Sequence, residues 1–273
     1  FWERQGASLC VLGREVSYTE LKEIRQRCPN IKLEAFVHGA MCMTYSGRCL
    51  LSNFMAERGA NQGACANSCR WKYKVHMRLK DGTLKELLLS EENTELFEFL
   101  LEEEIRPGDL MPIEEDERGS YILNSKDLCI MPKLDDYLRI GVDSLKVEGR
   151  GKSIFYVAMV ARAYRMAIDD WYKNSKAWHP KKYMNELLTI PNRGYTLAFH
   201  EGRLTNHSHG YENTGTIGSF EFAAVILGHD KNSFIVEGKN KLIAGDVLEF
   251  IPPKSYSPIL LRIYEFLDAK SNK

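Results

Sequence analysis

The chain has 273 residues, of which 44% are hydrophobic and 27% charged, and its 37 basic side chains balance its 37 acidic ones. This composition excludes wholesale disorder, and the balance excludes a chain that is basic throughout. The longest apolar runs are far shorter than the ~20 residues of a membrane span, and the first residues lack the order of a signal peptide. We therefore expect a cytoplasmic protein without membrane association. Because the chain starts at Phe1 rather than Met, we also expect a fragment.

The first forty residues have the order of elements that is typical of a parallel α/β sheet. Residues 7–12 form a short apolar run that predicts a strand. Ser17 and Glu20 have the spacing of a capping box, which predicts a helix that ends near Cys28. Residues 31–38 alternate between apolar and polar, which predicts a second strand. A strand, a helix and a strand with short connections indicate a βα unit.

The middle of the chain does not continue this alternation of strand and helix. Residues 40–70 are rich in Cys, Gly, Asn, Ser and Ala, which is typical of a long functional loop. Residues 71–89 predict strands around a turn at Asp81 and Gly82. An acidic stretch follows, and its apolar spacing predicts a helix over about 92–105 whose carboxylates face solvent.

The rest of the sequence predicts helices first and strands later. Helices are expected over 125–138 and 154–171, with a strand over 141–148 between them. Short β-prone runs separated by Gly, Asn, Asp and Pro fill 193–262, which indicates a small antiparallel barrel or sandwich. The two predicted domains are residues 1–175 and residues 176–273.

Four of the seven cysteines fall within one stretch of 28 residues. They are Cys42, Cys49, Cys65 and Cys69. Thiolates are soft ligands that suit zinc or an iron–sulfur cluster. Zinc ribbons usually contain pairs of cysteines separated by two residues, and no pair here has that spacing. The pattern therefore favours an iron–sulfur cluster first, unliganded thiols second and zinc third.

The other titratable residues give weaker signals. Cys129 is an alternative fourth ligand, whereas Cys10 and Cys28 are expected to pack as small hydrophobic residues. His38 ends a predicted strand directly before the cysteine-rich stretch, where a site role and a structural role are equally favoured. The chain has no His-Glu-x-x-His zinc motif, no Gly-x-Ser-x-Gly elbow and no phosphate-binding loop. A peptidase would therefore need a different kind of site.

A basic and aromatic stretch follows the last of the four clustered cysteines. Its residues are Arg70, Trp71, Lys72 and Tyr73. Cations interleaved with aromatic rings suit phosphate contact together with base stacking, so this stretch is a candidate RNA-binding segment. The alternative is an ordinary amphipathic strand with a basic exposed face.

Two motifs connect these observations. Residues 34–42 read Glu-Ala-Phe-Val-His-Gly-Ala-Met-Cys, and residues 47–52 read Gly-Arg-Cys-Leu-Leu-Ser. Further matching segments lie at Arg58, 61–65, 69–73, 121–128, 141–146 and 148–150. Together they strongly resemble the collagenase-like peptidase family U32. The resemblance covers about two-thirds of the chain, and the combination of motifs is highly specific.

This resemblance implies a fold and an activity. The implied fold is α/β: the second part of an incomplete (β/α) TIM-type barrel without its upstream strands, followed by a small antiparallel β-barrel domain. Bacterial members of the family hydroxylate the wobble uridine of tRNA in a prephenate-linked reaction, which implies an RNA-modifying hydroxylase with tRNA as its partner. The alternative is a collagenase-like peptidase, a hydrolase that acts on protein. The second alternative is a non-catalytic binding fragment.

The resemblance also implies a cofactor and a co-substrate. A 4Fe-4S cluster would be held by Cys42, Cys49 and Cys65, which fall on the shared motif. Cys69 would be the fourth ligand, with Cys129 as its alternative. Prephenate would be the co-substrate. Oxygen insertion at an unactivated ring carbon needs such a redox centre, because acid–base residues alone cannot perform it.

Three further residues are the candidate catalytic group. His38, Glu148 and Arg150 lie at predicted strand ends, where a barrel places its active site. Arg150 suits a carboxylate of prephenate or an RNA phosphate, because its guanidinium can pair with either through two hydrogen bonds. Arg48 joins residues 70–73 as a candidate RNA contact.

Overall fold

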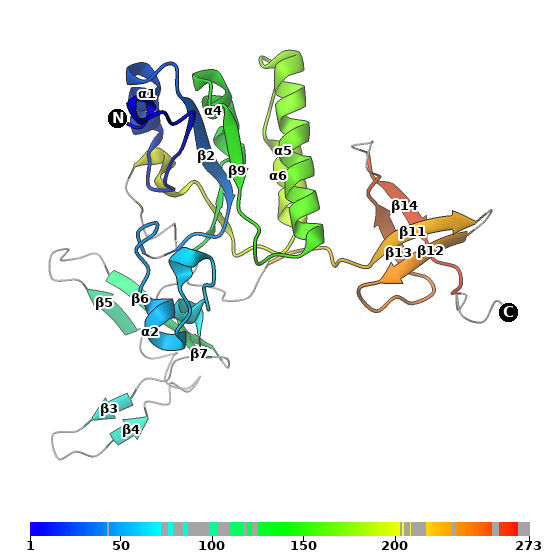
Figure 1. Ribbon diagram of the computed structural model, residues 1–273. Helices are drawn as coiled ribbons and strands as arrows, with labels where there is room; N and C mark the ends of the chain where they lie inside the picture. The colour runs from blue at the N-terminus through cyan, green and yellow to red at the C-terminus, as the bar shows by residue number, and fades with distance from the viewer. Residues whose placement is uncertain are drawn as a thin grey trace.

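The computed structural model of the chain is drawn in Figure 1. It describes residues 1–42, 44–71, 76–78, 84–86, 99–102, 110–116, 119–121, 125–202, 204, 208, 217–230, 233–252 and 257–266. A mixed sheet with helices beside it forms the main body, and two hairpins lie at the C-terminal end (Figure 1). In the residues so described, every helix is too short or too polar to span a bilayer.

Five strands form the main sheet. They are β1 (Leu9–Val11), β2 (Lys32–Gly39), β8 (Asp127–Cys129), β9 (Ser144–Val147) and β10 (Tyr195–Thr196). β1 and β9 pair with β2 in parallel, β8 pairs antiparallel with the end of β2, and β10 pairs in parallel with β8. The predicted α/β class is confirmed. The sheet is mixed, however, and its described strands do not close into a barrel.

The central strand β2 is built from alternating side chains. Leu33, Ala35 and Val37 are all buried, because successive residues of a strand point to opposite faces. The register with β9 shifts by one residue between Phe36 and His38. Such a shift re-aims the side chains that follow it, and here both Val37 and His38 are fully buried.

Helices and short 3-10 turns complete the main body. They are α1 (Tyr18–Arg27), α2 (Leu51–Ala56), α4 (Leu134–Ile140), α5 (Ile154–Asn174) and α6 (Lys181–Thr189), with turns η1 (Glu3–Gln5), η2 (Ala60–Gln62), η3 (Ser68–Arg70), η4 (Met131–Lys133) and η5 (Ala198–Glu201). The predicted capping box of α1 is confirmed: the Ser17 hydroxyl accepts from the Glu20 N–H at 3.3 Å, and the Glu20 carboxylate accepts from the Ser17 N–H at 2.8 Å. The helix predicted over 154–171 is confirmed as α5. Its buried side includes Val160, Ala163 and Ala167, whereas Ile154, Val157 and Ala161 are exposed.

The main body takes elements from both sides of residue 175. α6 packs along α5, and the Arg162 guanidinium donates to the Glu186 carboxylate between them. Asp127 and Arg193 form an ion pair whose side chains are 0% and 7% exposed. Since α6, Arg193 and β10 all follow residue 175, a chain cut there would lose a strand and part of the core.

Smaller antiparallel sheets occupy the middle of the chain. They are formed by β3 (His76–Arg78) with β4 (Leu84–Glu86), and by β5 (Phe99–Glu102), β6 (Leu110–Asp116) and β7 (Gly119–Tyr121). The predicted strands within 71–89 are confirmed for β3 and β4, whereas the turn at Asp81 and Gly82 lies outside the described residues. The helix predicted over 92–105 was wrong, because Phe99–Glu102 is a strand paired with β6. The helix predicted over 125–138 is confirmed from Met131 onward as η4 and α4, but Asp127–Cys129 is a strand of the main sheet, because tertiary pairing overrides weak local helix propensity.

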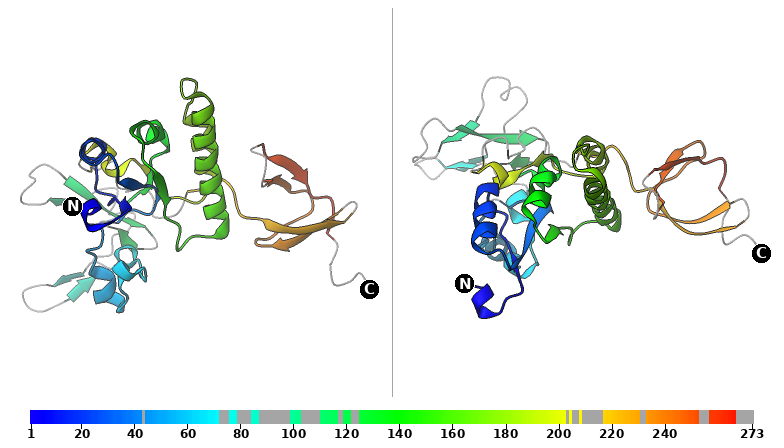
Figure 2. Two further views of the ribbon diagram at one scale, coloured as in Figure 1. Left: turned by 45° about the horizontal axis from the view of Figure 1, so that its top comes forward. Right: turned by 90° about the horizontal axis from the view of Figure 1, so that it is seen from above.

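Two hairpins form the C-terminal end. β11 (Ala224–Asp230) pairs with β12 (Ser233–Gly238), and β13 (Val247–Phe250) pairs with β14 (Ile259–Arg262), both antiparallel. Figure 2 shows this pair of hairpins beside α5, away from β1 and α1. The rings of Phe155 and Phe222 stack with centroids 4.9 Å apart, which joins the start of α5 to the segment before β11. The predicted β-rich C-terminal region is confirmed as antiparallel strands.

Candidate functional site

Two of the predicted catalytic residues meet where neighbouring parallel strands end. His38 lies at the end of β2, and Glu148 directly follows β9. The Glu148 N–H donates to the His38 carbonyl at 2.8 Å. Gly39 has a φ of +126°, and a Cβ built on it would lie 2.6 Å from the Glu148 Cβ. The close approach of these strand ends therefore requires glycine at this position.

The His38 imidazole is enclosed by aromatic side chains. Its ring centroid lies 5.9 Å from that of Tyr156, 5.6 Å from that of Tyr164 and 5.3 Å from that of Tyr195. Among the described residues, neither ring nitrogen has a hydrogen-bond partner, and the Tyr156 hydroxyl also has none. Burial, assisted by the charge of Lys152, lowers the pKa of His38 to about 3. The imidazole is therefore neutral near pH 7 and keeps one donor and one acceptor for a ligand or water.

The Glu148 carboxylate organises the backbone at the strand ends. One oxygen accepts from the Ala40 N–H at 3.3 Å, and the other accepts from the Arg150 N–H at 3.0 Å. The Arg150 guanidinium lies directly on the backbone of Gly63, where an added Cβ would overlap it. Glu148 and Arg150 thus both contact the segment that carries the clustered cysteines.

That segment, residues 40–71, is hereafter the cysteine loop. Its short helical pieces are α2, η2 and η3. The Asn61 side chain accepts from the Cys49 N–H at 3.3 Å and donates to the Cys49 carbonyl at 3.5 Å. The Ser52 hydroxyl accepts from the Ala66 N–H at 2.9 Å and donates to the Arg58 carbonyl at 2.8 Å. These side-chain bonds hold a loop that has little regular backbone structure.

The four predicted cluster ligands all lie on the cysteine loop. Cys42 is exposed, and Cys49, Cys65 and Cys69 are partly buried. Backbone N–H groups at the start of α2, that of Ser52 first, lower the pKa of Cys49 and so favour its thiolate. Four accessible thiols on one loop have the donor chemistry that an iron–sulfur cluster requires. In the described part of the chain, no three His, Cys, Asp or Glu side chains converge at metal-binding distance.

Cys129, the alternative fourth ligand, lies in a different environment. Its side chain is buried in β8, within hydrogen-bond distance of the Tyr164 hydroxyl at 3.9 Å and of the Met184 sulfur at 3.7 Å. Burial raises its pKa to about 12, which keeps the sulfur protonated. A protonated, enclosed thiol is poorly suited to bind a metal or to act as a nucleophile.

The predicted RNA contacts are only partly described. Arg48 is exposed on the cysteine loop. Trp71 is 39% exposed, and its indole N–H donates to the Ala66 carbonyl at 3.2 Å. Arg70 ends η3, and the description extends only to its backbone. Lys72 and Tyr73 lie outside the described residues.

A cationic group near the ends of β1, β2 and β9 was not predicted from the sequence. The Arg14 guanidinium carbon lies 3.9 Å from the Phe36 ring centroid, and the Lys146 ammonium lies 5.4 Å from the same centroid. The Glu34 carboxylate accepts from Lys146 at 2.8 Å and from the Ser144 hydroxyl at 2.7 Å. Two-residue alternation along β2 places Glu34 and Phe36 on one face, and this was the available sequence signal.

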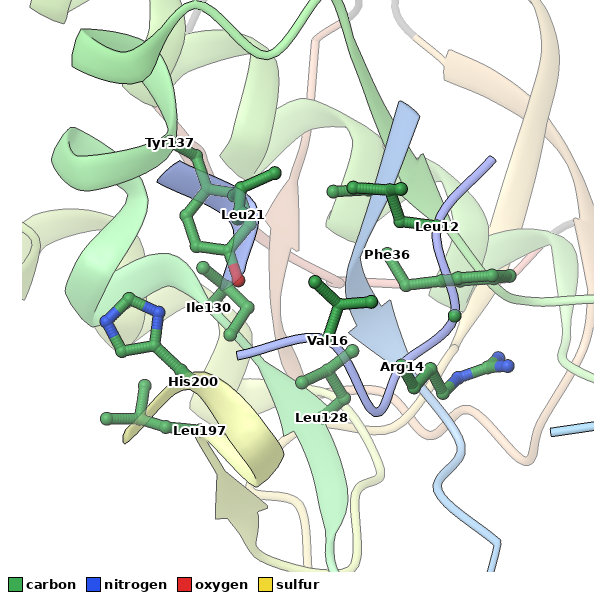
Figure 3. A pocket seen from close by; sticks show the side chains of 12 residues that line it. Leu12, Arg14, Val16, Leu21, Phe36, Leu128, Ile130, Tyr137, Leu197 and His200 are labelled. Carbon is green, nitrogen blue, oxygen red and sulfur yellow. The ribbon is translucent and has the colours of Figure 1, made fainter. Parts of the chain in front are cut away.

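Arg14 and Phe36 also line a pocket on the sheet. Figure 3 shows their side chains lying alongside one another, with Tyr137 and His200 further along the pocket. Its volume is about 340 Å³, open solvent included. The Arg14 Nε atom is buried and has no hydrogen-bond partner among the described residues. The ion pairs found in the described residues do not include Arg14, so its guanidinium can bind an anionic group. The remaining lining residues are Leu12, Gly13, Val16, Leu21, Ala35, Leu128, Ile130 and Leu197.

Known proteins resemble this chain over most of its length. It is 39% identical to the "tRNA hydroxylation protein P" of Escherichia coli over 93% of this chain and 59% of that protein. It is 36% identical to the protein of that name from Haemophilus influenzae over 99% of this chain and 62% of that protein. A "Collagenase" of Porphyromonas gingivalis is 28% identical over 77% of this chain and 46% of that protein. No solved structure matches significantly.

The chain thus spans about three-fifths of the length of the two tRNA hydroxylation proteins. The family model described as "Peptidase family U32" matches residues 1–210, which include the main sheet and the cysteine loop. The motifs around His38, the cysteine loop and Glu148 all fall within that match. This chain belongs to peptidase family U32.

Proposed function

We propose that this chain is part of a tRNA-modifying hydroxylase that inserts oxygen into the wobble uridine. The observation that carries the proposal is the position of the cysteine loop, which carries four thiols. Glu148 and Arg150 contact this loop at the ends of β2 and β9. The identity to the tRNA hydroxylation proteins of Escherichia coli and Haemophilus influenzae supports it. We place the protein in the cytoplasm, with tRNA as its partner.

The proposed cofactor is a 4Fe-4S cluster. Cys42, Cys49, Cys65 and Cys69 would hold it, and Cys129 would not, because its buried thiol stays protonated. When bound, such a cluster supplies the redox chemistry that oxygen insertion needs. The main sheet would be the second part of a (β/α) TIM-type barrel, which places the cysteine loop at the mouth, and the hairpins would form the small antiparallel β-barrel.

The chain's own residues would bind and orient the substrate. His38 is neutral, so it can donate or accept one hydrogen bond at the strand ends without adding charge. Arg14, fixed against Phe36, would bind an anionic group such as an RNA phosphate or a carboxylate of the proposed co-substrate prephenate. Arg48 and the half-exposed Trp71 lie on the cysteine loop, where they would contact the RNA.

The experiment compares cysteine variants after anaerobic purification. Cys49→Ser is expected to lose bound iron and sulfide, whereas Cys10→Ser, a partly buried cysteine of β1, is expected to keep both. Mass spectrometry of tRNA from a deletion strain that carries each variant reports the modified uridine. Full iron and sulfide in Cys49→Ser would overturn the cluster assignment. Cleavage of collagen by cluster-free protein, with unmodified tRNA, would favour the peptidase alternative instead.

A further inference from the structure

The contact between Arg150 and Gly63 joins the end of β9 to the middle of the cysteine loop. Gly63 ends η2 with a φ of +82°, and its N–H donates to the Ala60 carbonyl at 3.0 Å. A Cβ built on Gly63 would overlap the Nη1 end of the Arg150 guanidinium, so this end lies next to the Gly63 backbone. The left-handed conformation requires glycine here, and an added side chain would also displace Arg150.

The covered part of the loop is linked to two of the proposed cluster ligands. Cys65 follows Gly63 by two residues. On the other side of Gly63, the Asn61 side chain holds both the N–H and the carbonyl of Cys49. Gly63 thus lies in the short segment that sets the position of Cys49 relative to Cys65.

The backbone of Arg150 is held at a defined place, and its side chain is exposed. The Arg150 backbone N–H donates to the Glu148 carboxylate, whose other oxygen accepts from the Ala40 N–H, two residues before Cys42. The peptide segment 148–150 therefore contacts the cysteine loop at its start, through Glu148, and at its middle, through Arg150. Residues more than eighty positions apart in the sequence are brought together in this way.

We propose that Arg150 is a positioning residue for the cysteine loop. By lying on Gly63, its guanidinium holds the segment with Asn61 and Cys65 against the end of β9. The part of this inference that concerns a cluster rests on the proposed function, whereas the part that concerns the loop does not.

The experiment measures thiol alkylation in the cluster-free protein. Iodoacetamide labels each accessible cysteine, and mass spectrometry of peptides gives separate rates for Cys49 and Cys65. We expect Gly63→Ala and Arg150→Ala each to raise both rates by about threefold or more, the lower range of coupling between groups in contact. The double variant is expected to label no faster than the faster single variant, because both changes remove the same contact.

A second glycine of the same loop provides the matched control. Gly47 also has a positive φ, +74°, but among the described residues no atom beyond its chain neighbours lies within 4 Å of a Cβ built on it. Gly47→Ala therefore introduces the same backbone strain without touching Arg150, and we expect labelling within about 1.5-fold of the parent. Rates that multiply in the double variant, or an unchanged rate in Arg150→Ala, would show that the contact does not position the loop.

Measuring the bound iron distinguishes the role of Arg150 in the loop from the proposed cluster cofactor. After reconstitution with iron and sulfide, Gly63→Ala and Arg150→Ala are expected to hold less iron per chain than Gly47→Ala. If the parent protein itself binds no iron, the proposed cofactor is wrong, but the labelling rates still decide whether Arg150 positions the loop. If the parent binds iron and all three variants match it, Arg150 has no role in cluster binding.

Discussion

The end of β2 and the cysteine loop that follows it are stabilised in different ways. Around His38, contacts connect residues far apart in the sequence: the Tyr164 hydroxyl donates to the Val37 carbonyl at 2.7 Å, 127 positions away. Within the loop, the Asn61 and Ser52 side chains bond to backbone no more than 14 positions away. Long-range packing makes the strand end part of the global fold, whereas short-range bonds stabilise the interior of the loop, which Glu148 and Arg150 contact from the end of β9.

This difference predicts that substitutions in the two regions have different effects on stability. A change in the buried core alters the free energy of unfolding of the whole protein. A change in the cysteine loop alters local opening and metal binding, and it can lower global stability by no more than the free energy of opening the loop. Three measurements test this division, beginning with the largest expected effect.

Breaking the buried ion pair between Asp127 and Arg193 is expected to destabilise the whole fold. Arg193 donates to Asp127 from its backbone N–H at 3.2 Å and from Nε at 2.8 Å. Arg193→Leu leaves the buried carboxylate without its cation, which costs about 3–5 kcal/mol in the free energy of unfolding. Urea denaturation measures the loss.

An exposed ion pair gives the matched control for that experiment. Arg165 and Asp169 pair on the surface of α5 with side chains 57% and 37% exposed. Arg165→Leu is expected to change the free energy of unfolding by less than about 1 kcal/mol. Equal losses in Arg165→Leu and Arg193→Leu would contradict the idea that the buried pair is part of the global fold.

His38 is expected to make the core sensitive to acid. Its pKa in the folded protein is about 3, well below the value of about 6.5 for an unfolded chain. Between these values the unfolded state binds the extra proton, so stability falls as the pH is lowered. The loss is about 1.4 kcal/mol per pH unit, or about 3 kcal/mol between pH 6.5 and pH 4.

The variant His38→Phe isolates this contribution. Phenylalanine fits among aromatic rings but cannot be protonated, so the slope of stability against pH in this window should become flatter. His229→Gln, which changes an exposed histidine of β11, should leave the slope as it is. A slope that is the same in His38→Phe and the parent would mean that the imidazole is not buried in its neutral form.

The smallest global effect is expected inside the cysteine loop. Ser52 is buried and bonds to both Ala66 and Arg58. Ser52→Ala removes these two bonds, which should ease local opening by about 1 kcal/mol, as hydrogen exchange of the loop amides can measure. The free energy of global unfolding should fall by no more than that same amount, because both openings start from the native state. Ser46→Ala, at an exposed position of the loop, is the control.

Local patterns in the sequence predicted much of the fold. The Ser17 capping box, the alternation in β2 and the extent of the long helix α5 are each readable within one element. The helix predicted over 125–138 was wrong in its first part, because Asp127–Cys129 finds strand partners at His38 and in β10, which no local pattern contains.

The sequence predicted the candidate site only where its residues lie close together along the chain. The cysteine loop shows its chemistry in the spacing of its thiols, and His38 directly precedes it. The contacts of Arg14 with Phe36, and of Arg150 with Gly63, join segments whose proximity depends on strand order and register. The sequence shows which side chains are present, whereas the order and register of the strands determine which of them are in contact.

The tyrosines that surround His38 have a consequence at the other end of the pH scale. Burial is the main cause that raises the pKa of Tyr156, Tyr164 and Tyr195 above its ordinary value near 10. As the pH rises, the tyrosines of an unfolded chain lose these protons before those of the folded protein, so the free energy of unfolding falls. The same core is therefore destabilised by alkali through its tyrosines and by acid through the His38 imidazole. The ultraviolet absorbance of tyrosinate therefore gives an optical record of core opening: these rings should ionise together, as the fold opens, rather than one by one.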